Sequence, residues 1–154
     1  VVLDVWEGEP AINTDLLEKV DLGTPHIAGY SLDGKLRGTE MIYRAACEFL
    51  GTPVQWGAAA GLPPGPSLDL AGAGDVLEAA RAAVLQCYDV RADDARLRQI
   101  LALSPEEGAA CFDRLRKEYP VRREFAETEL WATHMDTRLE QVLAGLGFTI
   151  GSTG

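Results

Sequence analysis

The chain begins with VVLDVWEGEP at residues 1–10, and this segment is the clearest indication of its fold class. The run Val1–Val5 is short, largely apolar and rich in β-branched residues, and a polar loop follows it. This pattern is typical of a buried parallel strand, and α/β proteins place their chemistry in the loops at the carboxyl ends of such strands. We therefore predict an α/β fold with two acidic side chains, Asp4 and Glu9, near a functional edge of a sheet.

The segments that follow alternate between helical and extended patterns. A short helical turn is predicted over residues 14–20, and the proline within residues 20–26 keeps that segment extended. Ser31 is a suitable N-cap for a helix that runs to about Leu50, and Gly51 ends it. Several apolar side chains of this helix fall on one face, namely Met41, Ile42, Ala45, Ala46 and Phe49.

A change of composition separates the two halves of the chain. Residues 52–67 are rich in Ala, Gly and Pro, which is typical of a linker between a first part at 1–51 and a second domain at 68–154. The second domain mixes strand-like and helical segments, which indicates a small α+β domain. Its predicted helices cover residues 75–88, a turn opened by Asp93 or Asp94, a segment between the capping residue Ser104 and Pro120, and residues 136–144. Its predicted strands cover residues 67–71, 122–131 and 147–150.

The composition is that of a globular protein, and its charge argues against two classes of partner. The chain has 154 residues, of which 47% are hydrophobic and 25% are charged. Fourteen Lys and Arg against 24 Asp and Glu give a net charge of -10. Such a charge repels nucleic acid and anionic membrane surfaces. We therefore expect neither nucleic-acid nor membrane partners.

The three cysteines bear on the compartment and on metal binding. Cys47, Cys87 and Cys111 are far apart in the sequence, and no histidine near them would complete a metal site. We expect reduced thiols in a cytoplasmic protein without a bound metal. The chain also starts without Met, inside the strand-like run, so we expect the natural start to lie upstream and the sequence to be a fragment.

A histidine joins the two acidic residues as a candidate for chemistry. The number of residues between Glu9 and His26 is enough for a helical turn and a return strand to bring both side chains to one edge of a sheet. If the two meet, the carboxylate favours the imidazolium and fixes which ring nitrogen holds the proton. Oxidation of an alcohol with a nicotinamide requires such a proton acceptor. Spacing alone favours an ordinary role, in which Asp4 caps a turn, Glu9 is solvated and His26 is a hydrogen-bonded loop residue.

Two linked motifs favour the catalytic interpretation over the ordinary one. LDVWEGEP at residues 3–10, followed by GTPHIAGYS at residues 23–31, resembles the signature of the NAD-dependent D-2-hydroxyacid dehydrogenases. The resemblance implies that residues 1–51 form the carboxyl-terminal end of a Rossmann-type NAD-binding domain. It also implies a set of site roles, which are nicotinamide binding by Asp4, orientation of the catalytic His26 by Glu9, NAD contact by Gly29 and substrate contact by Tyr30.

Two of these site residues have structural alternatives. A glycine at position 29 permits close backbone approach to a ligand, and glycine is also the usual residue of a turn with positive φ. Tyr30 serves nearly as well as a packing residue against the helix that follows it. The motif implies the functional roles, and the residue types alone leave both alternatives open.

The second half resembles the carboxyl-terminal dimerisation domain of one branch of this family, through residues 83–91 and 112–125. That branch oxidises a phosphorylated 2-hydroxy acid, so the resemblance implies this substrate class and a homodimer formed through the second domain. The G-x-G-x-x-G loop, the acidic ribose-binding residue and the catalytic arginine of the family are absent from these residues, and we expect them upstream of Val1. The chain alone should then be inactive.

Two other interpretations stay open. The first is a related dehydrogenase acting on another D-2-hydroxy acid. The second is a non-catalytic relative that senses NAD or dimerises, although the presence of both Glu9 and His26 argues against it.

The basic residues of the second half are expected to form a solvated face without a catalytic role; they are Arg114, Arg116, Lys117, Arg122 and Arg123.

Overall fold

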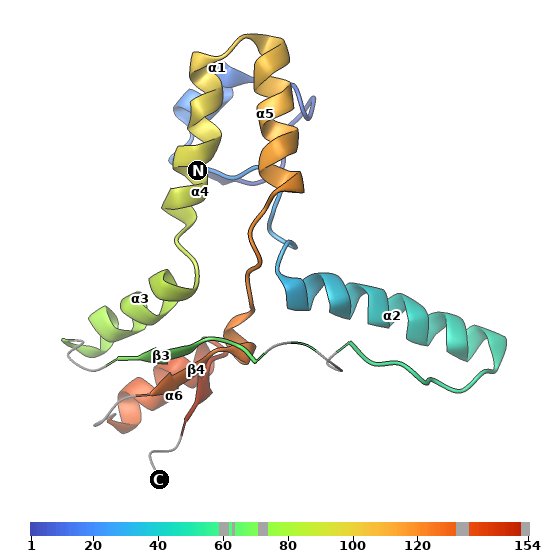
Figure 1. The fold of residues 1–154 in the computed structure, drawn as a ribbon. Coiled ribbons are helices and arrows are strands. Elements are labelled where there is room, and N and C mark those ends of the chain that lie inside the picture. The colour runs from blue at the N-terminus through green and yellow to red at the C-terminus, as the bar shows by residue number, and fades with distance from the viewer. Residues whose placement is uncertain (59–61, 63, 71–73, 132–135, 152–154) are drawn as a thin grey trace. The chain divides into compact units, whose positions relative to one another are not determined.

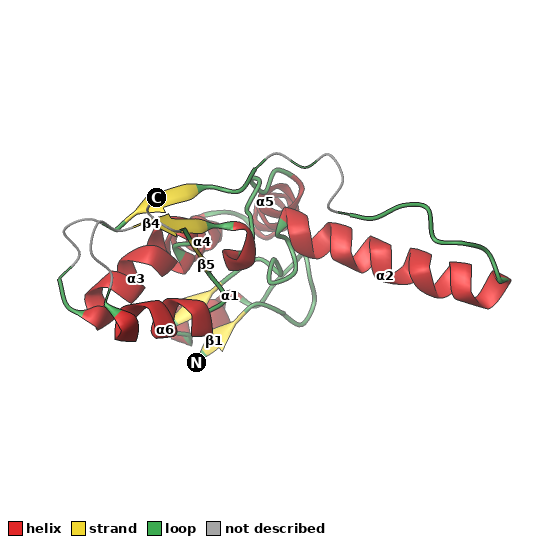
Figure 2. Cartoon of the chain, turned by 90° about the horizontal axis from the view of Figure 1, so that it is seen from below, coloured by secondary structure: helices red, strands yellow, loops and turns green. Residues whose placement is uncertain are grey.

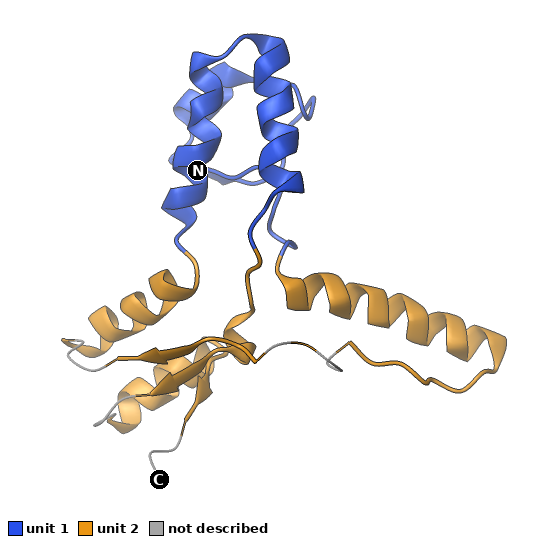
Figure 3. Cartoon of the chain, in the orientation of Figure 1, with its two compact units in different colours: residues 1–30, 89–120 blue, residues 31–88, 121–154 orange. Residues whose placement is uncertain are grey.

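The computed structural model describes residues 1–58, 62, 64–70, 74–131 and 136–151. The chain forms two compact units that are interleaved along the sequence (Figure 3). Unit 1 combines Val1–Tyr30 with Asp89–Pro120, and unit 2 combines Ser31–Tyr88 with Val121–Gly154. The division expected from the sequence is sequential, with a linker at residues 52–67. The packing units divide the chain at other positions. The roles assigned to residues 1–51 and 68–154 stay a prediction.

Unit 1 combines a pair of parallel strands with short helices (Figure 1). Strand β1 (Val2–Leu3) pairs in parallel with β2 (Leu22–Gly23). The helices are α1 (Thr14–Lys19), α4 (Val90–Leu97), the 3₁₀ segment Arg98–Ala102 and α5 (Pro105–Lys117). The parallel pairing is confirmed, but the expected burial of the first strand is wrong. Val2 is 63% exposed, since β2 is the one strand that pairs with β1 among the described residues.

The core of unit 1 fixes the loop that follows β1. Trp6 is buried in a cluster with Ile12, Leu17, Val20, Leu97, Ile100, Cys111 and Phe112. Its indole lies so close to Gly23 that a Cβ there would come within 2.8 Å of the ring, which no side chain could tolerate without a shift. The indole N–H donates to the carbonyl oxygen of Thr24 at 2.9 Å. Trp6 thereby ties the loop after β1 to the segment after β2.

The start of α4 differs from the prediction. The helix begins before Asp93 and Asp94, because the side chain of Asp89 accepts a hydrogen bond from the backbone N–H of Arg91 and caps it. Asp94 has another role, since it accepts a hydrogen bond from the N–H of Gly23 at 2.7 Å. This contact joins α4 to β2, and it links residues too far apart in the sequence to be read from a capping pattern.

Two helix starts predicted from capping residues are confirmed. Ser104 and Glu107 form a reciprocal capping box at the start of α5. The hydroxyl of Ser31 accepts a hydrogen bond from the first turn of α2 (Leu32–Leu50), and Gly51 forms its C-cap. These boundaries depend on contacts within four residues, and such contacts can be read directly from a sequence.

Unit 2 contains a three-stranded sheet in the order β3-β4-β5. Figure 2 draws the strands of the chain in yellow and labels β4 and β5 of this sheet. Besides α2, its elements are β3 (Ser67–Asp69), α3 (Val76–Cys87), a 3₁₀ turn (Phe125–Glu127), β4 (Glu129–Trp131), α6 (Thr137–Gly145) and β5 (Thr149–Ile150). Regular strand structure therefore covers much less than the predicted strand at residues 122–131. All three strands pair in parallel, which gives the sheet the character of an α/β fold.

Helix α2 lies where it was predicted, but most of its apolar face is not buried among the described residues. Met41, Ile42 and Phe49 are 71%, 74% and 89% exposed. Cys47 is buried on the same helix. The apolar periodicity therefore located the helix without identifying what its apolar side contacts.

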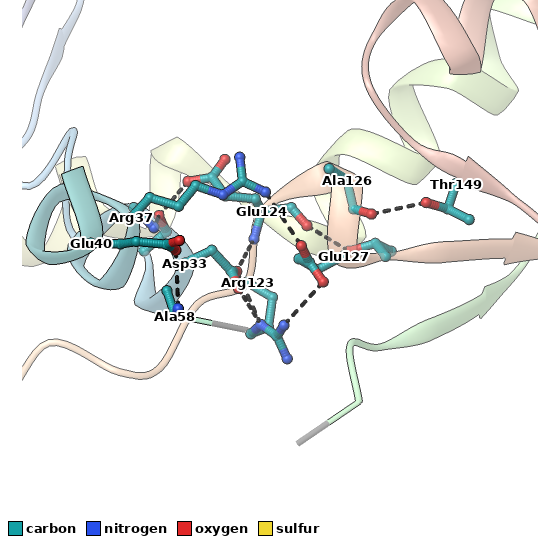
Figure 4. A network of polar contacts seen from close by, with 12 residues as sticks. Asp33, Arg37, Glu40, Ala58, Arg123, Glu124, Ala126, Glu127 and Thr149 are labelled. Carbon is teal, nitrogen blue, oxygen red and sulfur yellow. Dashed lines mark hydrogen bonds and ion pairs between the residues drawn. The ribbon is translucent and has the colours of Figure 1, made fainter. Parts of the chain in front are cut away.

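A buried ion pair holds the start of α2, as Figure 4 shows. The Nε of Arg123 lies 3.0 Å from each carboxylate oxygen of Asp33, and the two side chains are 9% and 3% exposed. The N–H of Glu124 donates to the same carboxylate at 2.8 Å, and the N–H of Leu32 donates to the carbonyl oxygen of Arg122. The expectation of a solvated basic face is therefore wrong for Arg123, whose partner is distant in the sequence.

The remaining sequence expectations concern thiols, metals and membranes. Cys47, Cys87 and Cys111 are all free, and the first and last are buried. Within the part of the chain that the structure describes, no three side chains of metal-ligating type gather in one place. None of the helices described is both long and apolar enough to cross a membrane.

Candidate active site

The structure brings Glu9 and His26 into direct contact within unit 1. The Oε2 atom of Glu9 lies 2.8 Å from Nδ1 of His26. The glutamate side chain is 18% exposed, whereas the histidine side chain is 44% exposed. Glu9 is therefore not the solvated residue of the ordinary interpretation. The Glu9 side chain is mostly enclosed by protein, whereas the His26 side chain is accessible to solvent and to a bound molecule.

The backbone at His26 is unusual. Its φ angle is 56°, in the left-handed region that residues other than glycine rarely adopt. The N–H of His26 donates to the carbonyl oxygen of Thr24 at 3.0 Å, which closes a tight turn after β2. Conformations of this kind cost about 1–3 kcal/mol and concentrate at functional sites, where the surrounding structure imposes them. The turn aims the imidazole at Glu9.

Glu9 is held as a carboxylate. One of its oxygens accepts the N–H of Trp6 at 2.8 Å, and the other contacts His26. Partial burial raises the pKa of the Glu9 carboxyl, but the hydrogen bonds from His26 and Trp6 and the favourable electrostatics of His26 and then Arg116 outweigh it. The net effect is a pKa below the ordinary value, so the group is ionised at neutral pH.

An ionised carboxylate decides which nitrogen of the imidazole carries the proton. Because a carboxylate accepts hydrogen bonds and donates none, Nδ1 of His26 must be the protonated nitrogen in this contact. The other nitrogen, Nε2, is left to exchange a proton with a bound molecule. The pair can therefore act as a general acid or base, with Glu9 fixing the orientation and tautomer of His26.

Asp4 organises the turn that carries His26. Its Oδ1 accepts hydrogen bonds from the hydroxyl of Thr24 at 2.6 Å and from the N–H of Ile27 at 2.7 Å. Its Oδ2 accepts the N–H of Ala28 at 3.1 Å. Asp4 thus does cap a turn, as the ordinary interpretation expected. Each carboxylate oxygen has two lone pairs, so among the described residues Oδ2 retains acceptor capacity for a ligand amide.

Gly29 and Tyr30 follow this turn. Gly29 is exposed, and a Cβ at this position would meet no atom within 4 Å. Its φ is outside the left-handed region, which His26 occupies instead, so the turn with positive φ suggested for Gly29 is wrong. The ring of Tyr30 meets that of Tyr119 edge to face, with centroids 5.9 Å apart. The structure leaves room beside Gly29 and fixes the ring of Tyr30 from one side.

The sequence interpretation missed three residues that shape this site. Thr24 and Trp6 supply hydrogen bonds to Asp4 and Glu9, and Arg116 of α5 places its guanidinium carbon 5.7 Å from the centroid of the Tyr30 ring. A signal for Arg116 was present, since it lies four residues after the buried Phe112, on the same face of the helix. Thr24 lies inside the motif at residues 23–31, although no role was assigned to it there.

The chain is similar to known proteins over nearly its whole length. Residues 62–147, more than half of the chain, match the family described as "Domain of unknown function (DUF3410)". A protein of Marinobacter nauticus named erythronate-4-phosphate dehydrogenase is 49% identical over 97% of this chain and 40% of its own length. Proteins of the same name from Cronobacter sakazakii and Cellvibrio japonicus are 46% and 45% identical over 96% of the chain.

The matched region is only part of these relatives. The chain spans about 40% of the length of the curated relatives it matches, with 38% of the Cronobacter sakazakii protein covered. The similarity nevertheless includes both the site segment and the second half. The chain belongs to the DUF3410 family, and along nearly its whole length it is similar to curated erythronate-4-phosphate dehydrogenases.

Proposed function

We propose that a full-length protein carrying this chain is an NAD-dependent dehydrogenase that oxidises 4-phospho-D-erythronate. The product would be (R)-3-hydroxy-2-oxo-4-phosphooxybutanoate, an intermediate of pyridoxal 5′-phosphate biosynthesis. The single observation that carries the proposal is the contact of 2.8 Å between Glu9 and the half-exposed His26. The names of the relatives and the two linked motifs support the choice of substrate.

The chemistry assigned to the chain is proton transfer. Nε2 of His26 takes the proton of the C2 hydroxyl, and the imidazolium that forms is stabilised by the adjacent Glu9 carboxylate. Glu9 keeps its charge because its pKa lies below the ordinary value. NAD, when bound, supplies the hydride acceptor. The substrate carboxylate would be held by an arginine outside this chain, as the family resemblance implies.

The residues assigned to the cofactor fit a nicotinamide. Oδ2 of Asp4 retains acceptor capacity for the carboxamide N–H₂ group. The open space beside Gly29 allows a planar ring to approach the backbone. These two features support the binding roles proposed for Asp4 and Gly29. The half-buried ring of Tyr30 supports its proposed contact with substrate.

The test is a substrate panel on the full-length protein. NAD reduction is followed at one enzyme concentration with 4-phospho-D-erythronate, D-erythronate, D-lactate and D-glycerate. The proposal predicts the highest kcat/KM for 4-phospho-D-erythronate. A preference for another D-2-hydroxy acid would assign a different dehydrogenase activity. Binding of NAD without turnover of any substrate would identify a non-catalytic relative, and either result refutes the proposal.

We also propose that the protein is a homodimer formed through residues 68–154. Leu77 of α3 and Leu146 after α6 are 77% and 43% exposed, and apolar side chains of this kind are suited to a self-complementary interface. Light scattering coupled to size exclusion on the full-length protein should give twice the mass of one chain. A Leu77→Glu variant should shift that mass towards the monomer, and a wild-type monomer at all concentrations would contradict the proposal.

A further inference from the structure

Among the described residues of the candidate site, Arg116 is a cationic side chain that acts on both Glu9 and Tyr30. It belongs to α5, and its guanidinium carbon lies 5.7 Å from the centroid of the Tyr30 ring. Its positive charge is close enough to Glu9 to help lower the pKa of that carboxyl. Glu9 orients His26, so the charge of Arg116 acts on the proposed proton-transfer pair through Glu9.

The hydrogen bonds of Arg116 are incomplete in this structure. Its Nε atom is buried and has no hydrogen-bond partner, and it is the one buried side-chain nitrogen or oxygen in this condition among the described residues. Leaving a buried donor unpaired is unfavourable, and such groups in folded proteins call for a specific explanation. Guanidinium groups match the oxygens of phosphates and carboxylates, so an anion is the ligand that this side chain suits.

Another arginine of unit 1 shows what a purely structural guanidinium looks like. All three nitrogens of Arg98 are used: Nε contacts the Asp94 carboxylate, and the other two donate to the carbonyl oxygens of Leu17 and Val20. These contacts bind the 3₁₀ segment to the end of α1. The Nε of Arg116 lies in the same unit, and none of the described residues supplies an acceptor for it.

The aromatic residues beside Arg116 are themselves fixed. The hydroxyl of Tyr119 donates to Asp93 at 3.0 Å, and its ring meets Tyr30 edge to face. Tyr30 is thereby held next to the guanidinium of Arg116. The same tyrosine is the residue to which the proposed function assigns substrate contact. A cation beside a fixed substrate-contacting ring is placed to bind a charged group of the substrate.

We propose that Arg116 binds the phosphate group of the substrate. This inference rests on the proposed function, in which the substrate carries a carboxylate next to the reacting carbon and a phosphate at its other end. The carboxylate is assigned to an arginine outside this chain, so the phosphate is the anion that needs a donor. In a chain with a net charge of -10, a guanidinium beside the substrate-contacting ring is a group that attracts such an anion.

The inference is tested on the full-length protein with matched variants. Arg116→Met removes the charge and keeps an apolar side chain of similar length, Arg116→Lys keeps the charge, and Arg114→Met is the control on the exposed side of the same helix. Arg116→Met should lower kcat/KM for 4-phospho-D-erythronate by about 10- to 100-fold, mainly through KM. Arg116→Lys should recover part of this loss, and Arg114→Met should change it by less than about twofold.

The comparison with D-erythronate separates phosphate binding from support of the fold. Turnover of this unphosphorylated substrate should change by less than about threefold in Arg116→Met, and inhibition by inorganic phosphate should weaken by the same factor as the loss with 4-phospho-D-erythronate. Equal losses with both substrates, or unchanged inhibition by phosphate, would overturn the inference while leaving the proposed function intact. A wild-type protein that does not oxidise 4-phospho-D-erythronate would refute the proposed function, and the phosphate role with it.

Discussion

Unit 1 and unit 2 each contain a contact between an acidic and a basic side chain that lie far apart in the sequence, and the two contacts are suited to different roles. Glu9 and His26 in unit 1 are 2.8 Å apart, with the histidine 44% exposed. Asp33 and Arg123 in unit 2 are 3.0 Å apart, with both side chains below 10% exposed. A guanidinium does not lose its proton in proteins, whereas an imidazole does so near neutral pH. The first pair is suited to chemistry and the second to stability.

The largest effect expected from breaking the first pair is on turnover. Replacing His26 with Asn in the full-length protein should lower kcat by about 10²- to 10⁴-fold, because the proton acceptor is lost. Asn is chosen because it tolerates the left-handed backbone at this position better than Ala does. The affinity for NAD, measured by fluorescence titration, should be unchanged. A kcat within threefold of wild type would remove His26 from the mechanism.

Breaking the second pair should act on stability. Asp33→Ala leaves the buried Arg123 without its main partner, which should lower the free energy of unfolding by about 3–5 kcal/mol. Denaturant titration of the full-length protein measures this. Glu48→Ala is the matched control, because Glu48 is an exposed acid on the same helix, and its effect should stay below about 0.5 kcal/mol. Equal effects of the two variants would mean that the ion pair does not hold α2.

The pH dependence of stability should sharpen the same contrast. Burial raises the pKa of Asp33, but the hydrogen bond from Arg123 and the N–H of Glu124 outweigh it and leave the pKa below its ordinary value of 3.8. A carboxyl with a lowered pKa in the folded state stabilises the protein above its unfolded pKa and loses this effect as the pH falls through the folded value.

The difference in unfolding free energy between wild type and Asp33→Ala should therefore be constant above about pH 5 and shrink as the pH falls below 3.8. Acid titrations of both proteins at matched denaturant concentrations measure it. A difference that grows on acidification would show that the carboxyl is not stabilised in its charged form.

The smallest predicted effect concerns the helix that carries Arg116. Ser104 and Glu107 form the capping box of α5, and Ser104→Ala should lower the free energy of unfolding by about 1 kcal/mol. Ser104→Thr keeps the capping hydroxyl and should lose less. Since the cap lies three turns from Arg116, kcat should stay within about twofold of wild type in both variants. A loss of turnover equal to that of the His26 variant would show that the cap supports the site directly.

How far the sequence predicted the structure depended on the range of the contacts. The capping box at Ser104 and the helix begun by Ser31 were predicted correctly because their signals lie within one helical turn. The pairing of Asp33 with Arg123 was not, because the two residues are 90 positions apart and neither has a local pattern. The cap of α4 departs from this rule, because Asp89 contacts the N–H of Arg91 only two residues away and the helix start was nevertheless predicted at Asp93 or Asp94.

In the candidate site, contacts between residues far apart in the sequence were likewise not predicted, with one exception. The contact of Glu9 with His26 is not local, yet the motif around the two residues led us to propose it. Thr24 and Trp6 lie inside the same motifs, but the resemblance gave no role to the hydroxyl that Thr24 donates to Asp4 or to the N–H that Trp6 donates to Glu9. A family resemblance therefore identified the pair, whereas the hydrogen bonds that fix it required coordinates.

The central claim is that Glu9 acts on the reaction only through His26, and a double-mutant cycle on kcat tests it most directly. Glu9→Gln removes the charge and keeps the shape of the side chain. It should lower kcat of the full-length wild type by about tenfold or more, and it should add less than about twofold to the loss in the His26→Asn protein, because residues that act as a unit are not additive. An equal loss from Glu9→Gln in both backgrounds would contradict the account, since the two side chains would then act independently.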